Sequence, residues 1–490
     1  MEHQNRTKIL QSLNELKKRK LWIMAEEQCL GYLESNPGDE MVRAELAEVY
    51  WNVNDFGQCL TIYEKLLEEH PHNKSLMRQA ALAAMRCGMV SSALAHAKAY
   101  RDVVGDTPES ISLRLEIYER NNMVAEAKEM LGEATKLGVD RPALDYYQSR
   151  ILLQDKRYDD AIDLMRTIVS QERYSSSDEI LAQFWFLLTK AYDRTGEYDL
   201  AWSAAESAHN STTSRWHQKG WDDRVESILN TFDREMVDSM VRAPSSDERP
   251  IFIVGNPRSG TSLLEQILGM HSQIDNGGEM SVSSLMEARL AQLTDSFQPW
   301  PVNLYDMRAG DAEQLLGMYT DARRFVCPDA PYVTNKSLVL EGQLGFLSLL
   351  FDKAKAINLH RHPLDNCVSC YTTPLHHAGH SYASNLESLA KVWIGRRRLK
   401  DHWASVIDMP ILELHYEQLV SNQEAETRRL IEFLEVPWED GCMEFHTSKK
   451  VARTISYDQV NQKMYTSSSG RWMRYEKHLG PLIDLLSDYL

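Results

Sequence analysis

The sequence predicts a two-domain protein, in which an α-helical repeat solenoid precedes an α/β domain with a mainly parallel sheet. A helix-face pattern that recurs every 34 residues predicts the solenoid, and a proline in the turns between copies supports it. Short apolar strands that alternate with longer helical patterns predict the second domain. We expect the repeats over residues 1–240, a linker at 241–250 and the α/β domain over 251–490.

A large side chain recurs at a spacing of 34 residues through the first half of the chain, at Trp22, Phe56, Val90, Val124 and Tyr158. A small residue follows each at the third position, from Ala25 to Ala161, and Tyr198 with Ala201 adds a later copy. Two residues three apart share one helix face, where a small side chain lets the next helix approach closely. The pattern predicts about five or six helix–turn–helix units.

This period is that of tetratricopeptide repeats, and residues 20–215 resemble that family. Arrays of this kind stack into a superhelix whose concave face is typically used to bind a peptide or a partner protein. The resemblance therefore implies a peptide or protein partner on the concave face. A purely structural role, as a scaffold for the domain that follows, stays open.

Composition and charge exclude several classes of function. Lys and Arg total 54 against 71 Asp and Glu, a net charge of −17, which argues against a nucleic-acid binder. Any anionic ligand needs a local cationic pocket instead. No run of 18 apolar residues predicts a membrane span, and the first residues lack the apolar core of a secretion signal. With seven sparse cysteines, interpreted as reduced thiols, these features predict a cytoplasmic protein without a membrane partner.

A glycine loop between a strand and a helix is the most informative stretch of the second half. The apolar run 251–254 precedes the loop 255–262, which has the GxxxxG spacing of a nucleotide-binding loop. Its backbone N–H groups and the helix N-terminus would attract an anion. Thr261 stands where a P-loop has lysine, which disfavours ATP or GTP hydrolysis, while Arg258 offers a planar fork suited to an oxyanion. The loop predicts a nucleotide that carries a phosphate-like anion but no γ-phosphate.

A sulfuryl donor meets these demands. In 3′-phosphoadenosine 5′-phosphosulfate (PAPS), the 5′ phosphosulfate and the 3′-phosphate are separate anions, so a protein that binds it needs two anion sites. A second strand-to-helix junction, at 355–371, supplies a candidate for the second site. Arg361 closes the strand and Ser369 falls eight residues later, in the first turns of the helix, so both can face one phosphate.

These two segments resemble the sulfotransferase superfamily. PRSGTSLLEQIL, at 257–268, is similar to its 5′-phosphosulfate loop, and RHPLDNCVS, at 361–369, is similar to its 3′-phosphate motif. With the repeats ahead of this domain, the chain resembles bacterial repeat-containing sulfotransferases, and its catalytic domain is similar to protein-tyrosine sulfotransferases. The resemblance implies a P-loop-like α/β fold and transfer of a sulfuryl group from PAPS to a hydroxyl or amine acceptor. Adenosine 3′,5′-bisphosphate would be the product, and no metal would be required.

The resemblance also implies a set of site residues. The donor-binding residues would be Arg258, Ser259, Gly260, Thr261, Ser262, Arg361, Ser369, Tyr416 and Arg471. The catalytic residues would be Arg258, Glu279, Lys336 and Ser456. A carboxylate within reach of the acceptor hydroxyl can take its proton, which is the role expected of Glu279. Arg258, Lys336 and Ser456 would stabilise the charge that develops on the sulfuryl and bridging oxygens.

Three positions depart from the tyrosine enzymes. Thr373 and Ser281 stand where those enzymes have arginines, and Glu279 is single where they have an acidic pair. Donor binding therefore carries over better than acceptor specificity. Peptide tyrosine, a sugar hydroxyl and a small metabolite stay open as acceptors, and the oligomeric state stays open too, a homodimer included. Two other functions stay open as well: a P-loop kinase, and a non-catalytic partner-binding scaffold with a relict nucleotide site.

Overall fold

The computed structural model describes residues 2–121, 123–138, 141–171, 178–212, 215–375, 379–447, 464 and 468–490. The chain packs as two compact units. The first consists of 1–140, 281–297 and 317–328, and the second of 141–280, 298–316 and 329–490. The repeat region is thus divided between the two units. The limits predicted at 240 and 250 follow the repeat period and the linker, and they stay a prediction about sequence modules.

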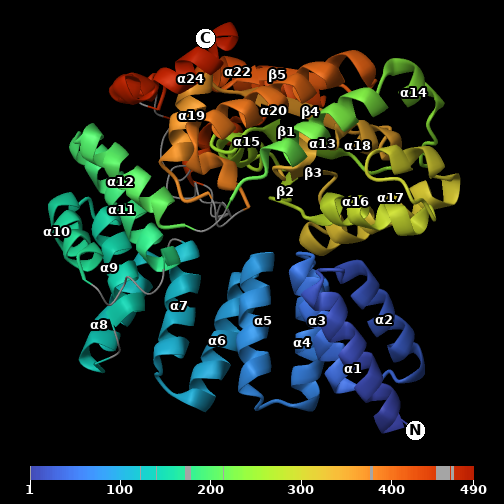
Figure 1. Cartoon of the computed structure of the whole chain (residues 1–490), viewed down its shortest axis with the longest axis horizontal. Helices are drawn as coiled ribbons and strands as arrows, with labels where there is room; N and C mark the ends of the chain where they lie inside the picture. Colours follow the sequence, from blue (N-terminus) through green and yellow to red (C-terminus); the bar gives the residue numbers. More distant parts are fainter. Residues whose placement is uncertain are drawn as a thin grey trace. The chain divides into compact units, whose positions relative to one another are not determined.

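Antiparallel helix pairs build the repeat part of the first unit (Figure 1). These helices are α1 (Glu2–Lys18), α2 (Trp22–Ser35), α3 (Glu40–Asn52), α4 (Phe56–Glu69), α5 (Lys74–Cys87), α6 (Val90–Val104), α7 (Pro108–Arg120) and α8 (Val124–Lys136). The later segments α16 (Val282–Leu293) and the C-terminal end of α17 (Ala309–Val326) belong to this unit as well. Gly57 of α4 faces Phe325 so closely that a Cβ there would lie 2.9 Å from its ring.

The 34-residue period marks the second helix of every repeat. The large residues at 22, 56, 90, 124, 158 and 198 each begin a helix, from α2 to α12. The small residue three positions later is buried in all six, as Ala25, Cys59 and Ala93 illustrate. Small buried side chains at these positions let neighbouring helices pack at close range. The helical-repeat prediction is confirmed.

A five-stranded parallel sheet forms the centre of the second unit, in the order β2-β3-β1-β4-β5. The strands are β1 (Pro250–Gly255), β2 (Ile274–Asn276), β3 (Tyr332–Asn335), β4 (Lys355–His360) and β5 (Ile411–His415). Central strand β1 is buried along its whole length, as expected for a parallel strand covered on both faces. The loops that follow β1, β3 and β4 meet at one edge of the sheet, where open α/β sheets bind their ligands. The predicted parallel sheet is confirmed.

Helices and short 3₁₀ segments complete the second unit. The α-helices are α9 (Arg141–Gln154), α10 (Tyr158–Val169), α11 (Asp178–Thr195), α12 (Tyr198–Asn210), α13 (Gln218–Thr231), α14 (Arg234–Ser239), α15 (Thr261–Leu268), α18 (Leu344–Leu350), α19 (Pro363–Tyr371), α20 (Leu386–Val406), α21 (Tyr416–Ser421), α22 (Gln423–Leu434) and α24 (Gly480–Leu485). The 3₁₀ segments are η2 (Val302–Asp306), η3 (Leu340–Gly342), η5 (Ser381–Ser384), η6 (Asp440–Thr447), η7 (Arg471–His478) and η8 (Ser487–Tyr489). None of the helices, over the described part of the chain, is long and apolar enough to cross a membrane.

The last repeat helices share a hydrophobic core with the α/β domain. Phe184 of α11 and Trp202 of α12 belong to the same buried cluster as Val368 of α19. The Trp202 ring stacks on the ring of Tyr371, with centroids 4.5 Å apart. His209 Nε2 also bonds to the Tyr371 carbonyl oxygen, at 2.8 Å. This packing places α9–α12 beside α19, the helix that carries the predicted Ser369.

Candidate active site

The glycine loop joins β1 to α15 in a strained backbone conformation. Arg258 has a φ of 66° and Gly260 a φ of 106°, both in the left-handed region. A Cβ at Gly260 would lie 2.6 Å from the Tyr416 ring, so only glycine allows this approach. Ser259 is 1% exposed, and its Oγ has no hydrogen-bond partner among the described residues. Strain together with an unpaired buried hydroxyl is typical of a ligand-binding loop.

Helix α19 holds this loop in place. Asn366 Nδ2 donates to the Pro257 carbonyl oxygen at 2.8 Å, and the Asn256 amide donates to Asn366 Oδ1 at 3.2 Å. Cys370 Sγ donates to the same Pro257 oxygen at 3.3 Å. Burial raises the pKa of the Cys370 thiol to about 12, so the thiol stays protonated and serves as a donor.

Arg361 connects the loop with the C-terminal segment. Its Nη1 donates to the Arg258 carbonyl oxygen and its Nη2 to the Ser468 carbonyl oxygen, both at 2.7 Å. The guanidinium carbon lies 4.8 Å from the centre of the Tyr416 ring. Arg361 Nε is buried with no hydrogen-bond partner among the described residues. The Tyr416 ring therefore packs against both Gly260 of the glycine loop and the Arg361 guanidinium. The predicted contact of Tyr416 with the nucleotide stays a prediction.

The predicted members of the second anion site lie together. Arg258 Nε donates to Ser369 Oγ at 3.3 Å, although 111 residues separate the two. Arg258, Arg361 and Ser369 line one open cavity with an empty volume of about 1380 Å³, part of which is open solvent. Sequence reasoning assigned Arg258 to the 5′ end and the other two to the 3′ end, and the structure brings all three to one place.

The predicted catalytic pair also comes together, from two different loops. Lys336, at the end of β3, is 2% exposed, and its Nζ lies 3.0 Å from Glu279 Oε1. The Lys336 backbone N–H donates to the Gly278 carbonyl oxygen at 2.9 Å. The Glu279 side chain stays 46% exposed, so a molecule from solvent can reach its carboxylate. In such a pair the buried cation can bind an anionic group, while the accessible carboxylate beside it can accept a proton.

Glu265 of α15 organises this pair, and sequence reasoning missed it. Its carboxylate is buried, and Oε1 accepts hydrogen bonds from the Gly278 backbone N–H at 2.9 Å and from Thr334 Oγ1 at 2.8 Å. Its Oε2 lies 3.9 Å from Lys336 Nζ. One side chain thus fixes the loop before Glu279 and the strand before Lys336. The signal available was an acidic residue within the apolar helix segment LLEQIL.

The predicted basic contact Arg471 lies in the cavity but already has partners. Its Nη2 lies 2.9 Å from Asp193 Oδ1, and both terminal nitrogens lie 3.4 Å from Thr372 Oγ1. Asp365 of α19 fixes the same segment, because its carboxylate accepts from the Gly470 and Trp472 backbone N–H groups at 2.7 and 2.8 Å. Ser456, the fourth predicted catalytic residue, falls outside the described residues.

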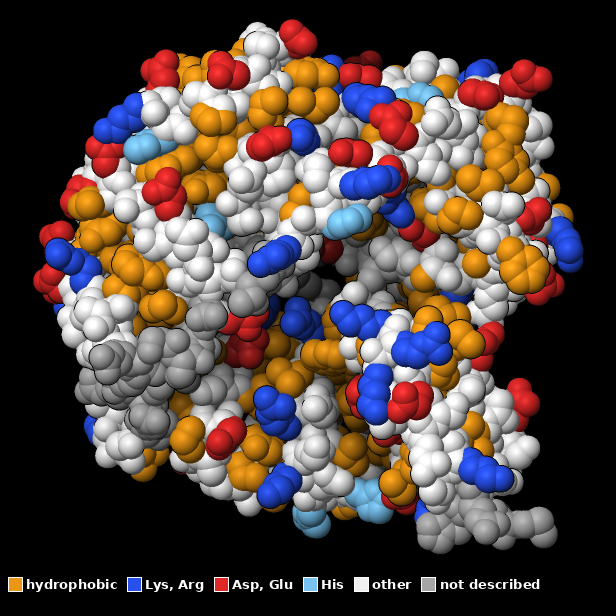
Figure 2. Space-filling view, viewed as in Figure 1, with side chains coloured by type: hydrophobic (Ala, Val, Ile, Leu, Met, Phe, Trp, Pro, Cys, Tyr) orange, Lys and Arg blue, Asp and Glu red, His pale blue; other side chains and the backbone are white. Residues whose placement is uncertain are grey.

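The cavity concentrates positive charge within an acidic chain. The lining residues are Tyr146, Arg150, Leu153, Gln154, Gln183, Phe186, Leu187, Thr189, Lys190, Asp193, Arg194, Arg258, Arg361, Ser369, Thr372, Thr373, Pro374, Ser468, Arg471 and Arg474. Of these described residues, seven are Lys or Arg and one is acidic. On the face seen in Figure 2, by contrast, basic and acidic side chains are interspersed. The net charge of −17 is thus compatible with the local cationic pocket that the sequence requires of an anion binder.

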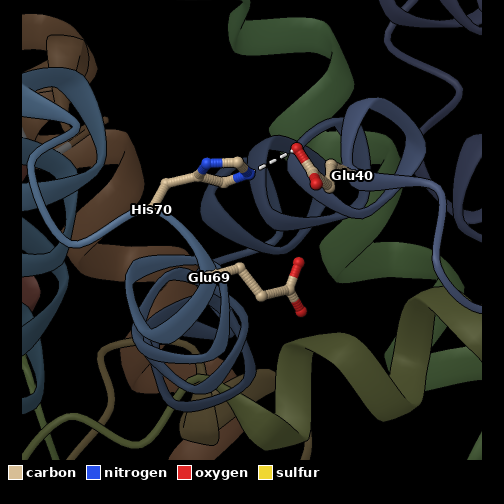
Figure 3. A group of neighbouring side chains, drawn as sticks. All are labelled: Glu40, Glu69 and His70. Atoms are coloured by element: carbon tan, nitrogen blue, oxygen red, sulfur yellow. Dashed lines mark hydrogen bonds and ion pairs between the residues drawn. The ribbon is translucent and has the colours of Figure 1, made fainter.

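One exposed cluster in the repeats has side chains that could ligate a metal. Glu40, Glu69 and His70 have ligand atoms that all lie within 4.8 Å of one another. Figure 3 shows these three side chains. His70 Nε2 bonds to Glu40 Oε2 at 2.6 Å, and Arg43 forms a two-pronged ion pair with Glu69. These contacts engage His70 Nε2, Glu40 Oε2 and both Glu69 carboxylate oxygens, and all three residues are exposed to solvent.

A parallel sheet with a glycine loop at its carboxyl edge and a cationic cavity beside that loop has the arrangement in which open α/β sheets bind their ligands. The model of the sulfotransferase family matches residues 250–440, which include the glycine loop, Glu279, Lys336 and Arg361. The tetratricopeptide repeat model matches residues 116–178. The chain therefore contains tetratricopeptide repeats followed by a domain of the sulfotransferase family.

Several known proteins are similar in sequence to this chain over part of their length. An uncharacterised protein of Aquifex aeolicus (strain VF5) is 28% identical over 341 residues, which cover 68% of this chain and 44% of that protein. Protein-tyrosine sulfotransferase A of Caenorhabditis elegans is 26% identical, over 43% of this chain and 56% of that protein. Protein-tyrosine sulfotransferase 1 of Danio rerio is 27% identical, over 46% of this chain and 65% of that protein. The chain spans about half the length of the curated relatives it matches.

Proposed function

We propose that this protein is a PAPS-dependent sulfotransferase that transfers a sulfuryl group to a hydroxyl or amine acceptor. The observation that carries the proposal is the ion pair between buried Lys336 and accessible Glu279, 3.0 Å apart, within a domain of the sulfotransferase family. A structural ion pair would not need a deeply buried lysine whose carboxylate partner faces solvent. A base that meets its substrate from solvent does need such exposure.

The residues of the cavity and the loop fit an anionic donor. Ser259 Oγ and Arg361 Nε are both buried hydrogen-bond donors with no partner among the described residues. A buried donor without an acceptor is costly, by about 1–3 kcal/mol, so both atoms favour an anion that would accept from them. When bound, PAPS supplies an activated sulfuryl group on a good leaving group.

The roles of the chain's own residues follow from their geometry. Glu279 accepts the proton that the acceptor hydroxyl loses as its oxygen bonds to sulfur. Lys336 and Arg258 stabilise the negative charge that grows on the sulfuryl and bridging oxygens as the old bond breaks. Glu265 keeps Lys336 and the loop before Glu279 in register. Positioning and electrostatics then supply most of the rate enhancement, as they do in phosphoryl transfer.

The tetratricopeptide repeats point to a protein-interaction role in general, and we propose that they present a peptide or protein acceptor. The matched relatives named protein-tyrosine sulfotransferases make a tyrosine-containing peptide the first acceptor to try. Ser281 and Thr373, where those enzymes have arginines, keep a sugar hydroxyl and a small metabolite in the panel.

The test is sulfuryl transfer from sulfur-labelled PAPS to a panel of tyrosine peptides, sugars and small hydroxyl compounds. We expect the wild-type protein to label one class. Glu279→Gln should lower turnover by about 10²–10⁴-fold, the usual contribution of a general base, and still bind adenosine 3′,5′-bisphosphate. The matched control is Glu435→Gln, an exposed glutamate 3.1 Å from Lys355 and absent from the cavity lining. Bisphosphate binding without transfer to any acceptor would favour the scaffold function instead.

A further inference from the structure

Helices of the repeat region form one wall of the nucleotide cavity. Helix α9 contributes Tyr146 and Arg150, and helix α11 contributes Lys190, Asp193 and Arg194. The opposite residues come from the α/β domain and include Arg258, Arg361 and Ser369. Both sets belong to the second compact unit, so the cavity lies within one packed body. The repeats thus place cations beside the residues predicted to bind the donor.

A network of hydrogen bonds fixes α11 against the end of α19. Asp193 Oδ1 accepts from Arg471 Nη2 at 2.9 Å and from Tyr475 Oη at 2.6 Å. The same Arg471 guanidinium reaches Thr372, the residue that follows α19. Asp193, the one carboxylate among the described lining residues, therefore helps to hold α11 against the end of α19. Its charge is matched by Arg471, and six further Lys and Arg residues belong to the described lining.

Two cations of this wall, Arg150 on α9 and Lys190 on α11, are positioned by residues of the same helix. Lys190 precedes Asp193 by three residues on α11, so both side chains lie on the same helix face. Arg150 Nη1 donates to Tyr146 Oη at 3.0 Å, and its guanidinium carbon lies 5.7 Å from the centre of that ring. An aromatic partner that orients a guanidinium lowers the entropy cost of binding an anion.

The lining also shows which end of the donor this wall would meet. Ser369 and Arg361, the predicted 3′-phosphate ligands, line the cavity, whereas Lys336 and Glu279 are not among the described residues of its lining. Thr373, where the tyrosine enzymes have an arginine, lines it too, and its hydroxyl donates to the Ser369 carbonyl oxygen at 2.7 Å. The repeat cations therefore stand near the 3′ end and away from the acceptor end.

We infer that Lys190 and Arg150 bind the 3′-phosphate of the donor nucleotide, so that the tetratricopeptide array is part of the donor site as well as a partner-binding module. This inference rests on the proposed function, because it takes the nucleotide to be one with a 3′-phosphate. Position 373 is an uncharged threonine here, where the tyrosine enzymes have an arginine. Arg150 and Lys190 would supply the missing positive charge from the repeats. The donor site is then complete only when α9 and α11 are packed on α19.

The experiment is calorimetric titration of the full chain with adenosine 3′,5′-bisphosphate and, separately, with adenosine 5′-monophosphate. A charge-assisted hydrogen bond to phosphate is worth about 1.5–3 kcal/mol, so Lys190→Ala and Arg150→Ala should each raise the bisphosphate Kd by about 10–100-fold. The monophosphate Kd should stay within about twofold of the wild-type value, since that ligand lacks the group in question. Lys190→Arg should recover most of the lost affinity, because it keeps the charge.

The matched control is Arg157→Ala, at the start of α10, whose guanidinium pairs with Asp160 at 2.7 Å and does not line the cavity. This variant should bind both nucleotides as the wild type does. If Arg361→Ala weakens bisphosphate binding while Lys190→Ala and Arg150→Ala change neither Kd, the inference is overturned and the donor site stands. Equal weakening for both nucleotides overturns it too. If the wild type does not favour the bisphosphate over the monophosphate, the proposed function itself fails.

Discussion

Glu265 and Glu279 both lie near Lys336, but one is buried and the other is exposed. We therefore predict that removing Glu265 destabilises the site much more than removing Glu279. The Glu265 side chain is 4% exposed and that of Glu279 is 46% exposed. Glu265→Ala removes the acceptor of the Gly278 N–H and of the Thr334 hydroxyl, and it takes one of two carboxylates from a buried lysine. Each unsatisfied buried donor costs about 1–3 kcal/mol, so the two donors together cost about 2–6 kcal/mol, while Lys336 keeps Glu279 at 3.0 Å.

We therefore expect Glu265→Ala to lower the local free energy of unfolding by about 2–6 kcal/mol. Glu279→Ala should lower it by about 1 kcal/mol, since an exposed partner contributes little and Lys336 keeps Glu265. Hydrogen–deuterium exchange of peptides from β1 and β3 measures both changes at the site itself. Glu265→Gln, which keeps an acceptor oxygen, should recover about half of the loss. Equal destabilisation by Glu265→Ala and Glu279→Ala would refute this reasoning.

Three further predictions concern the loop and the shared core. Gly260→Ala places a Cβ 2.6 Å from the Tyr416 ring at a φ of 106°, so we expect at least about 2 kcal/mol of destabilisation by denaturant titration. Gly278→Ala, with a φ of 70° and an open surrounding, should cost about 1 kcal/mol, and a reversed order would contradict the geometry. Trp202→Ala should cost about 3–5 kcal/mol and raise exchange in α19 as well as in α12, because the two helices share a core; exchange confined to α12 would count against it. Burial lowers the pKa of His209 below its ordinary value of 6.5, against the opposing hydrogen bond to Tyr371, so the unfolded state binds more protons below about pH 6.5. Stability should then decrease as the pH is lowered through that window, by at most about 1.4 kcal/mol per pH unit from this group. His209→Gln should flatten the slope of a urea-midpoint titration.

The repeat period and the loop spacings predict much of the fold because they record local geometry. A large residue with a small one three positions later predicts that both lie on one face of a repeat helix, and the structure places every such pair in a helix, from Trp22 in α2 to Tyr198 in α12. That each large residue begins the second helix of its repeat is seen only in the structure. The glycine spacing around Arg258 predicts a strand–loop–helix unit, which is what β1 and α15 form. Strand and helix patterns extend over a few residues, so they can be interpreted without knowing what packs on them.

The remaining features depend on contacts that no local pattern encodes. The period of 34 residues predicts how one repeat meets the next, but gives no sign that Trp202 stacks on Tyr371 far along the chain. Glu265 acts through Gly278 and Thr334, which only the parallel sheet brings near it. Arg471 was predicted as a nucleotide contact, and its ion pair with Asp193 could not be anticipated from either segment alone.

The central claim is that the cavity and the glycine loop bind a nucleotide with a 3′-phosphate, and thermal unfolding tests it most directly. At a hundredfold excess over its Kd, a ligand of the folded state adds about 2.7 kcal/mol of stability. For a unit of 321 residues this is a shift of roughly 4 °C. We predict this shift with adenosine 3′,5′-bisphosphate, and a smaller one in Arg361→Ala and Arg258→Ala. Stabilisation by ATP and magnesium alone would contradict the account and favour a kinase, and no shift with either would favour a scaffold.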